Sequence, residues 1–265
     1  MAFEKITSAQ NAFIKKVVHL RDRHARQKEG LTIVEGVREV QTAWQKKAAF
    51  ERIYFCPELF KDDALLNEFI AAGVIVCETT PEVFKKIMFG DRDEGILGVC
   101  RFPQMTLKDL KLGKNPLCVV VESVEKPGNL GAILRTCDGA KADALIVCGG
   151  LTEIYNPNTV RASLGAAFTV PAVSAPNEEA LEFLRSKKIK IFGTFPEGKK
   201  FYTASDFTGP SAIILGSEQD GLSDFWSKNA DEKIKIPLLG EVNSLNVAVS
   251  AAVVVYEVVR QRNAC

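Results

Sequence analysis

Hydrophobic residues along this chain gather in short continuous runs, with amphipathic stretches of helical period between them. In residues 1–103 four such runs, LTIVEG, ERIYFC, GVIVCET and GILGVCRF, alternate with helical patterns. Residues 116–265 carry six more, LCVVVESV, ALIVCGG, FTVPAV, IKIFGTF, SAIILGSE and KIKIP. Strands that alternate with helices predict layered α/β domains with mostly parallel sheets. The almost fully apolar runs of the second half indicate a six-stranded sheet with helices on both faces.

A short segment separates the two patterns. Residues 103–115 read PQMTLKDLKLGKN, in which Pro103, Gly113 and three lysines interrupt the hydrophobic pattern. Proline and glycine in such a stretch favour a connection. We therefore expect an N-terminal domain at 1–103, a linker at 104–115 and a C-terminal domain at 116–265, each of ordinary domain size.

The composition is that of a globular protein, with 46% hydrophobic and 25% charged residues. No apolar run reaches the roughly 18 residues of a transmembrane helix, and the N-terminus MAFEKITSAQ lacks the apolar segment of a signal peptide. The seven cysteines form no C-x-x-C pair, and several lie in apolar runs, which indicates buried, reduced thiols and a cytoplasmic location. Because the only histidines, His19 and His24, lie in a basic segment, we expect no metal site.

The net charge of +1 gives no overall indication of nucleic-acid binding. Residues 8–29 are predicted to form one or two helices, and a local excess of positive charge lies in 15–29. The basic residues there are Lys15, Lys16, Arg21, Arg23, Arg26 and Lys28. Such a cluster is either a solvated helix face, which is the commoner case, or a surface that contacts phosphates.

Three polar stretches follow predicted strands of the second half, the place where ligands bind in open α/β sheets. The first is Glu125–Gly131, which leads into a helix that carries Arg135. Its two glycines allow close backbone approach, and Asn129 can cap the helix, so this stretch is a candidate anion site. A dinucleotide-binding fingerprint is absent, because the pattern G-x-G-x-x-G does not occur here.

The other two stretches come later in the chain. Leu215–Ser223 holds Glu218 between two glycines, and Ile236–Asn246 is an apolar loop that runs into a helix whose predicted N-cap is Ser244. An apolar loop with a few polar groups is typical of a small-molecule site. Each stretch alone also fits an ordinary structural role, such as a capped helix, a tight turn or a buried helix.

Taken together and in this order, the stretches resemble a known set of motifs. Asn129-x-Gly-x-x-x-Arg135, Gly216-x-Glu218-x-x-Gly221 and Ile236-Pro…Ser244-Leu-Asn246-Val are similar to the three motifs of the SpoU (TrmH) family of RNA ribose methyltransferases, part of the SPOUT superfamily. The resemblance covers residues 116–260. The first half, with TIVEGVREV, is similar to the small L30e-like α/β/α substrate-binding domain that often precedes it. The resemblance implies a C-terminal SPOUT domain that ends in a deep trefoil knot.

The resemblance also implies a cofactor, S-adenosylmethionine, and no metal. The residues that would hold the cofactor are Leu215, Gly216, Ser217, Glu218, Gly221, Ile236, Leu238, Ser244, Leu245 and Asn246. The reaction would be methyl transfer to a ribose 2′-hydroxyl, with Arg135 either removing the hydroxyl proton or stabilising the developing alkoxide. The polar residues that would position ribose, Arg135 and cofactor are Asn129, Glu218, Ser244 and Asn246.

The family also suggests partners. Its members are homodimers through the C-terminal domain, with the last helix and the first-motif helix at the interface. The basic helix residues Lys15, Lys16, Arg21, Arg23 and Arg26, together with Arg135, become candidates for RNA contact. We expect rRNA as the substrate, with tRNA second. The alternative is a non-catalytic RNA-binding or ribosome-assembly protein that retains the fold, and a dehydrogenase is disfavoured by the missing glycine fingerprint.

Overall fold

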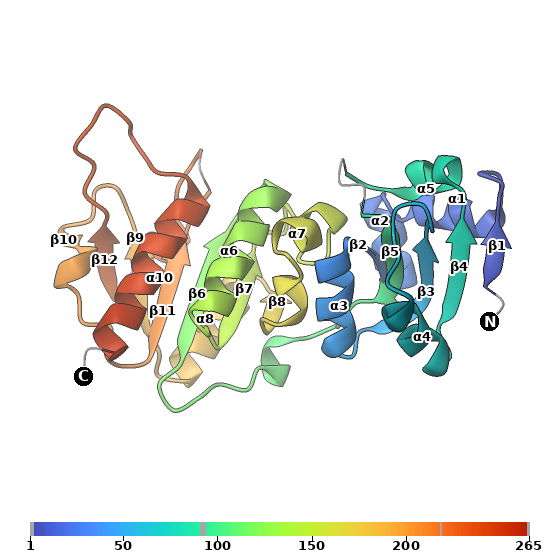
Figure 1. Ribbon diagram of the computed structural model, residues 1–265. Helices are drawn as coiled ribbons and strands as arrows, with labels where there is room; N and C mark the ends of the chain where they lie inside the picture. Colours follow the sequence, from blue (N-terminus) through green and yellow to red (C-terminus); the bar gives the residue numbers. More distant parts are fainter. Residues whose placement is uncertain (1–2, 91–93, 218, 264–265) are drawn as a thin grey trace. The chain divides into compact units, whose positions relative to one another are not determined.

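Strands of the first hundred residues form a five-stranded sheet in the order β1-β4-β3-β5-β2 (Figure 1). The strands are β1 Glu4–Ile6, β2 Leu31–Glu35, β3 Ala49–Phe55, β4 Ile75–Thr79 and β5 Ile96–Arg101. The helices are α1 Ala12–His19, α2 Arg23–Glu29, α3 Val37–Gln45, α4 Asp63–Ala71 and α5 Pro81–Ile87. The computed structural model describes residues 3–90, 94–217 and 219–263.

This first sheet is mixed, whereas the sequence predicted a mostly parallel one. β1 and β3 each pair with β4 in parallel, but β5 lies between β3 and β2 and runs antiparallel to both. The prediction was wrong because an alternation of apolar runs and helices does not record strand direction. A strand that runs antiparallel between two neighbours gives the same pattern of apolar runs as a parallel one. Strand β1 was too short to be predicted at all.

Local capping explains where the helices of this unit begin and end. The Asp22 carboxylate accepts a hydrogen bond from the Ala25 N–H at 3.0 Å, so it caps α2, and Gly30 with a φ of 66° ends that helix. Thr80 caps α5 in the same way, and Pro81 occupies its first position. The basic segment therefore forms two separate helices.

Residues 116–263 supply a second sheet of seven strands, in the order β10-β12-β9-β11-β6-β7-β8 (Figure 1). Every pairing in it is parallel. The strands are β6 Leu117–Glu122, β7 Ala144–Cys148, β8 Ala172–Ser174, β9 Lys190–Thr194, β10 Lys200–Phe201, β11 Ser211–Leu215 and β12 Glu232–Lys235. The predicted parallel sheet is confirmed. It has one strand more than the six predicted, because β10 is two residues long and leaves no hydrophobic run.

Helices cover both faces of this sheet, as the apolar strands predicted. They are α6 Pro127–Gly139, α8 Asn177–Ser186, α9 Asp224–Asn229 and α10 Val247–Asn263. Side chains of α8 and α9, such as Leu184 and Trp226, share one core with Val120 and Ile214 of the central strands. On the other face α6 and α10 lie side by side (Figure 1). None of the helices among the described residues combines the length and apolar composition needed to cross a bilayer.

The chain divides into two compact units that do not follow sequence order throughout. One unit is Met1–Gln104 with Tyr155–Thr169, and the other is Met105–Ile154 with Val170–Cys265. Helix α7, Pro157–Ala162, thus belongs to the first unit, where the Thr32 hydroxyl donates to the Tyr155 carbonyl at 2.6 Å. The domain limits predicted above and the trefoil knot stay predictions.

Candidate active site

A pocket opens at the carboxyl ends of β9, β11 and β12 and encloses about 630 Å³, part of it open to solvent. It is lined by residues of four segments: Thr194, Phe195, Pro196, Leu215, Gly216, Ser217, Gly221, Ile236, Leu238, Asn243, Ser244, Leu245, Val247 and Ser250. The second and third polar stretches of the sequence therefore meet in one place. The pocket lining includes all predicted cofactor residues except Asn246 and Glu218, and Glu218 lies outside the described residues.

The loop after β11 closes tightly on itself. Ser217 and Gly221 form an isolated antiparallel bridge, in which the Gly221 N–H donates to the Ser217 carbonyl at 3.1 Å. The Ser217 hydroxyl also accepts from the Asp220 N–H at 3.1 Å. A Cβ on Gly216 would lie only 2.0 Å from the Gly221 carbonyl carbon, and Gly221 itself has a φ of 67°. Both glycines are thus required by the shape of this turn.

Helix α10 begins two residues later than the sequence predicted. Its first residue is Val247, and the Asn246 side-chain oxygen accepts from the Ala248 N–H at 3.0 Å. Asn246 is therefore the cap, and the predicted cap Ser244 is instead an exposed residue of the pocket wall. Serine and asparagine cap helices equally well, so the sequence could not choose between them.

A side-chain hydrogen bond joins the first polar stretch to this region. The Asn246 amide nitrogen donates to the Asn129 side-chain oxygen at 3.1 Å. Asn129 lies within the first turn of α6, whose N-cap is Lys126, so the prediction that Asn129 caps the helix was wrong. Its side chain contacts Asn246, the residue that caps α10, instead. All three predicted motifs are thereby connected in the C-terminal unit.

Arg135 lies further along α6, about one and a half turns beyond Asn129. It is exposed and does not line the pocket. Its guanidinium forms no hydrogen bond or ion pair with the described residues. A Cβ on Gly139, one turn later, would lie 2.8 Å from the Tyr256 hydroxyl of α10. Since residues four apart share a helix face, Arg135 lies on the side of α6 that faces α10.

Several basic side chains of α1 and α2 and the segment between them form contacts within the first unit. Arg26 is only 2% exposed and donates to the carbonyls of Leu20 and Arg21 at 2.9 and 2.7 Å. It supports the junction between α1 and α2, so its predicted place on an RNA-contacting surface was wrong. Arg21 donates to the carbonyls of Lys86 and Met88 at the end of α5, and remains exposed.

The remaining basic residues stay at the surface. Lys16 forms ion pairs with Glu29 and Glu51 at 3.1 and 3.7 Å, and both Lys15 and Arg23 are exposed. The sequence could not foresee the burial of Arg26, because a helix periodicity does not show which neighbour will cover a charged position.

Sequence reasoning missed one segment of the pocket. Thr194 ends β9, Phe195 and Pro196 follow it directly, and all three line the pocket with Leu215. The signal was present, because this segment follows an apolar strand and the carboxyl ends of parallel strands share one edge of a sheet. It was overlooked since it carries no charged or amide side chain.

The cysteines have the environment that the sequence predicted. All six that lie in the described residues are buried and unpaired. Burial raises the pKa of the Cys137 thiol to about 12, and the same effect raises that of Cys148 to about 12. These thiols are therefore inert core residues. No group of three or more His, Cys, Asp or Glu in the described part of the chain is placed to hold a metal ion.

Two families match the chain. The SpoU rRNA Methylase family matches residues 116–256, and the MRM3-like substrate binding domain matches residues 11–98. The chain belongs to the SpoU rRNA methylase family. The resemblance inferred from the three motifs is confirmed, as is the predicted two-part organisation with a substrate-binding module before the SpoU module.

Relatives with known functions match most of the chain. The 23S rRNA (uridine-2′-O)-methyltransferase of Streptomyces viridochromogenes is 29% identical, covering 98% of this chain and 93% of its own length. A 23S rRNA (guanosine-2′-O-)-methyltransferase of Ralstonia nicotianae is 32% identical, covering 81% and 89%. Among solved structures, the AdoMet-bound rRNA methyltransferase of Sinorhizobium meliloti has a TM-score of 0.90 with 26% identity, covering 97% of this chain and 98% of that one.

Proposed function

We propose that this protein transfers a methyl group from S-adenosylmethionine to the 2′-hydroxyl of a ribose in ribosomal RNA. The observation that carries the proposal is the single pocket formed by the loops at 215–221 and 236–247, tied to α6 by the bond between Asn246 and Asn129. The relatives are named as 23S rRNA 2′-O-methyltransferases, which supports rRNA ahead of tRNA.

The lining of the pocket suits S-adenosylmethionine in its chemistry, because it combines apolar walls with a few polar groups. Leu215, Ile236, Leu238 and Leu245 give apolar walls that suit an adenine ring, and the hydroxyl of Ser217 adds a polar group. When bound, the cofactor supplies a methyl group activated by a sulfonium sulfur.

The residues predicted for the site keep their proposed roles, with one addition. The proposed cofactor contacts are Leu215, Gly216, Ser217, Glu218, Gly221, Ile236, Leu238, Ser244, Leu245 and Asn246, and the strand-end residues Thr194, Phe195 and Pro196 now join them. Asn129, Glu218, Ser244 and Asn246 would position the ribose and the donor.

Arg135 is the proposed catalytic cation. A ribose hydroxyl attacks a methyl group efficiently only as its proton leaves, so negative charge develops on the oxygen. The exposed guanidinium of Arg135 offers several N–H donors to that oxygen or to a neighbouring phosphate. This placement suits electrostatic stabilisation of the developing alkoxide.

We propose that two copies associate through the face formed by α6 and α10. Val249 and Tyr256 of α10 are 49% and 50% exposed on this helix, and Arg135 lies on the side of α6 next to it. Covering this face would place Arg135 in a more enclosed environment, where its charge acts more strongly. Light scattering should give twice the chain mass of 29.0 kDa, and a mass of one chain would contradict this arrangement.

For RNA contact we propose the exposed basic residues of the first unit, Lys15, Lys16, Arg21 and Arg23, together with Arg135 of the second. Arg26 is left out because it is buried. We also place the protein in the cytoplasm, because its unpaired buried cysteines suit a reducing compartment.

The function can be tested with ribosomal RNA from cells that lack the gene. Purified protein and radiolabelled S-adenosylmethionine should methylate this RNA at one ribose, and mapping of 2′-O-methyl sites should locate it. RNA from cells with the gene should accept no label at that site. Calorimetry should detect cofactor binding without RNA; absence of both binding and label would favour a non-catalytic RNA-binding protein.

A further inference from the structure

A buried carboxylate lies at the carboxyl end of β6, the strand next to β11 in the sheet. Glu122 is the last residue of β6 and is 5% exposed. One of its oxygens accepts from the Ser223 hydroxyl at 2.7 Å and from the Asn177 amide at 2.6 Å. The other accepts from the Ser223 N–H at 2.8 Å. A charged group this deeply buried needs such partners to offset its desolvation.

Ser223 bonds to Glu122 instead of capping its own helix. It is the N-cap residue of α9, yet its side chain makes no capping hydrogen bond, although serine is among the best capping residues. Its hydroxyl donates to Glu122 instead. Asn177 is held in turn, because its side-chain oxygen accepts from the indole N–H of the fully buried Trp226 at 3.0 Å. The polar cluster is therefore anchored in the core.

The loop of residues 216–223 is tied to the sheet near both of its ends. The turn between Ser217 and Gly221 is closed by its own hydrogen bond. At its start, Leu215 pairs with Val121, so the loop leaves the sheet beside Glu122. At its other end, Ser223 donates two hydrogen bonds to Glu122, and Leu222 packs against the core of the sheet.

The loop that leads into α6 leaves the sheet at Glu122 itself. The next residue, Ser123, has a φ of 55°, and its N–H donates to the Cys148 carbonyl at 2.9 Å. Three residues further on, Lys126 caps α6, the helix that carries Asn129 and Arg135. The chain that leads to Arg135 therefore leaves the sheet at Glu122. The same residue anchors the loop that lines the pocket.

We infer that Glu122 is a positioning residue that fixes the spacing between the pocket loop 216–223 and helix α6. The inference rests on the proposed function, since that spacing sets how the methyl donor and Arg135 meet the ribose. Displacements of about 1 Å at such a site can cost on the order of a hundredfold in rate.

The test replaces Glu122 by glutamine, which keeps its shape but turns one acceptor oxygen into a donor that faces Ser223 or Asn177. In E122Q, amide hydrogen exchange at Gly221, Leu222 and Ser223 in the protein without ligand should be at least tenfold faster. The kcat should fall by roughly tenfold or more, because the reacting groups would be misplaced. The Kd for S-adenosylmethionine should rise by roughly three- to tenfold.

Glu232 provides a matched control in the same sheet. It is a carboxylate with several hydrogen bonds, but it lies at the amino end of β12, away from the pocket. E232Q should leave loop exchange, kcat and Kd at wild-type values. Ser223→Ala should give an intermediate effect, and E122Q combined with it should be no worse than E122Q alone, because the hydroxyl acts through Glu122.

Three results would overturn the inference. One is unchanged exchange in the loop of E122Q. Another is faster exchange with unchanged kcat and Kd. A third is a loss of kcat that only matches the fraction unfolded, measured by circular dichroism at the assay temperature. If wild-type protein itself transfers no methyl group, the proposed function fails, while the exchange result still decides whether Glu122 holds the loop.

Discussion

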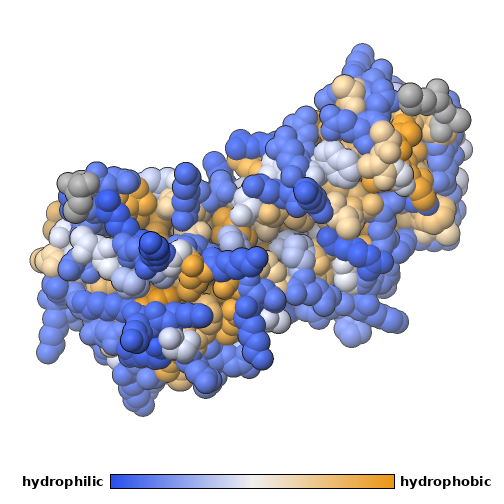
Figure 2. Space-filling model, turned by 90° about the horizontal axis from the view of Figure 1, so that it is seen from below, coloured by the Kyte–Doolittle hydropathy of each residue, from blue (hydrophilic) through white to orange (hydrophobic). Residues whose placement is uncertain are grey.

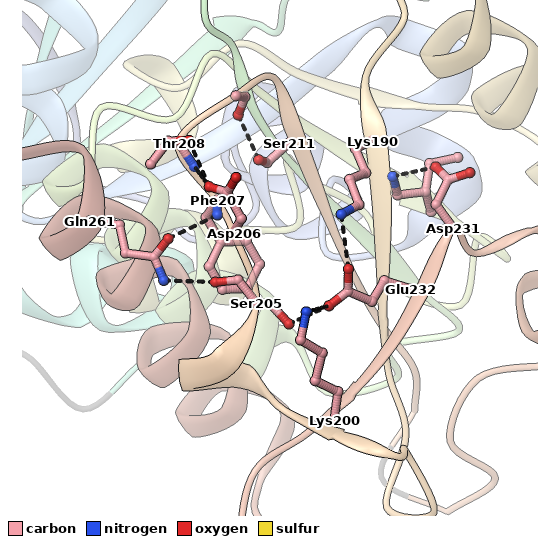
Figure 3. Close-up of polar contacts among 12 residues, drawn as sticks. Lys190, Lys200, Ser205, Asp206, Phe207, Thr208, Ser211, Asp231, Glu232 and Gln261 are labelled. Carbon is pink, nitrogen blue, oxygen red and sulfur yellow. Dashed lines mark hydrogen bonds and ion pairs between the residues drawn. The ribbon is translucent and has the colours of Figure 1, made fainter.

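The two ends of the parallel sheet in the C-terminal unit are built from different kinds of contact. At the carboxyl ends, apolar side chains and glycine-containing loops surround a pocket. At the amino ends, charged and amide side chains bond to one another and to backbone carbonyls (Figure 3). Seen from below (Figure 2), hydrophilic side chains cover much of the surface, with hydrophobic residues between them.

Glu232 and Gln261 are central to the polar end. Glu232 accepts hydrogen bonds from Lys190 and Lys200, both at 2.8 Å, and from the Ser205 hydroxyl at 2.6 Å. Gln261 of α10 donates to the Ser205 carbonyl and accepts from the Phe207 N–H, both at 2.9 Å. The neighbouring Arg262 donates to the carbonyls of Asn115, Pro116, Phe207 and Gly209.

The difference shows how one helix can serve both stability and binding. Helix α10 begins at the pocket, where Asn246 caps it, and ends among these polar contacts. Side-chain hydrogen bonds hold its C-terminal end. The loop before its N-terminal end is therefore not needed to anchor the helix, and its residues can line a ligand pocket. We therefore expect changes at the polar end to alter stability, and changes at the pocket end to alter binding and catalysis.

The largest expected effect is at Arg135. Replacement by alanine removes the proposed stabilising charge, and kcat should fall by on the order of a hundredfold or more. The Kd for S-adenosylmethionine and the melting temperature should stay near wild type, because the side chain is exposed and does not line the pocket. Single-turnover methylation of rRNA measures this, and full activity would remove Arg135 from the mechanism.

Gly216 tests the pocket end directly. A Cβ there would lie 2.0 Å from the Gly221 carbonyl carbon, so Gly216→Ala must displace the turn. Cofactor binding measured by calorimetry should weaken by roughly tenfold or more. Gly209→Ala is the matched control, because a Cβ at that position meets nothing within 4 Å. Equal binding by both variants would show that the turn does not contact the cofactor.

Arg262 tests the polar end. Arg262→Ala leaves four carbonyl oxygens without this donor and should lower the free energy of unfolding by about 3 kcal/mol, with no change in cofactor Kd. Arg260→Ala is the control, because Arg260 is exposed and pairs with Glu257 three residues earlier, so its loss should change the free energy of unfolding far less. Urea unfolding measures both. A larger effect of Arg262→Ala on cofactor binding than on stability would contradict the assignment of stability to the polar end and binding to the pocket end.

The smallest expected effect is a pH dependence. Partial burial alone would raise the pKa of Glu232, but hydrogen bonds from Lys190, Lys200 and Ser205 outweigh it and lower this pKa to about 2. A lowered pKa contributes stability above the unfolded value of about 4.5, which is lost as the pH falls toward 2. The stability difference between wild type and E232Q should therefore shrink across this range, as measured by urea unfolding; a constant difference would contradict it.

Much of this molecule could be predicted, for physical reasons that particular residues illustrate. Buried parallel strands such as Leu117–Glu122 must be apolar on both faces, and that requirement is visible in the sequence. Gly216 and Gly221 were visible as turn residues, because a Cβ on Gly216 would collide with the backbone of Gly221 and the φ of 67° at Gly221 favours glycine. The choice of Asn246 over Ser244 as a cap was not visible, since both residues are good caps and only the contact with Asn129 distinguishes them.

The sequence by itself determined the alternating elements, the parallel second sheet and the three polar stretches, because periodicity and turn chemistry act over a few neighbouring residues. Only the tertiary structure decided which charges are buried, as with Arg26 and Glu122, and that β5 runs against its neighbours. Burial and strand direction depend on residues far away in the chain. Local patterns carry no information about those distant partners.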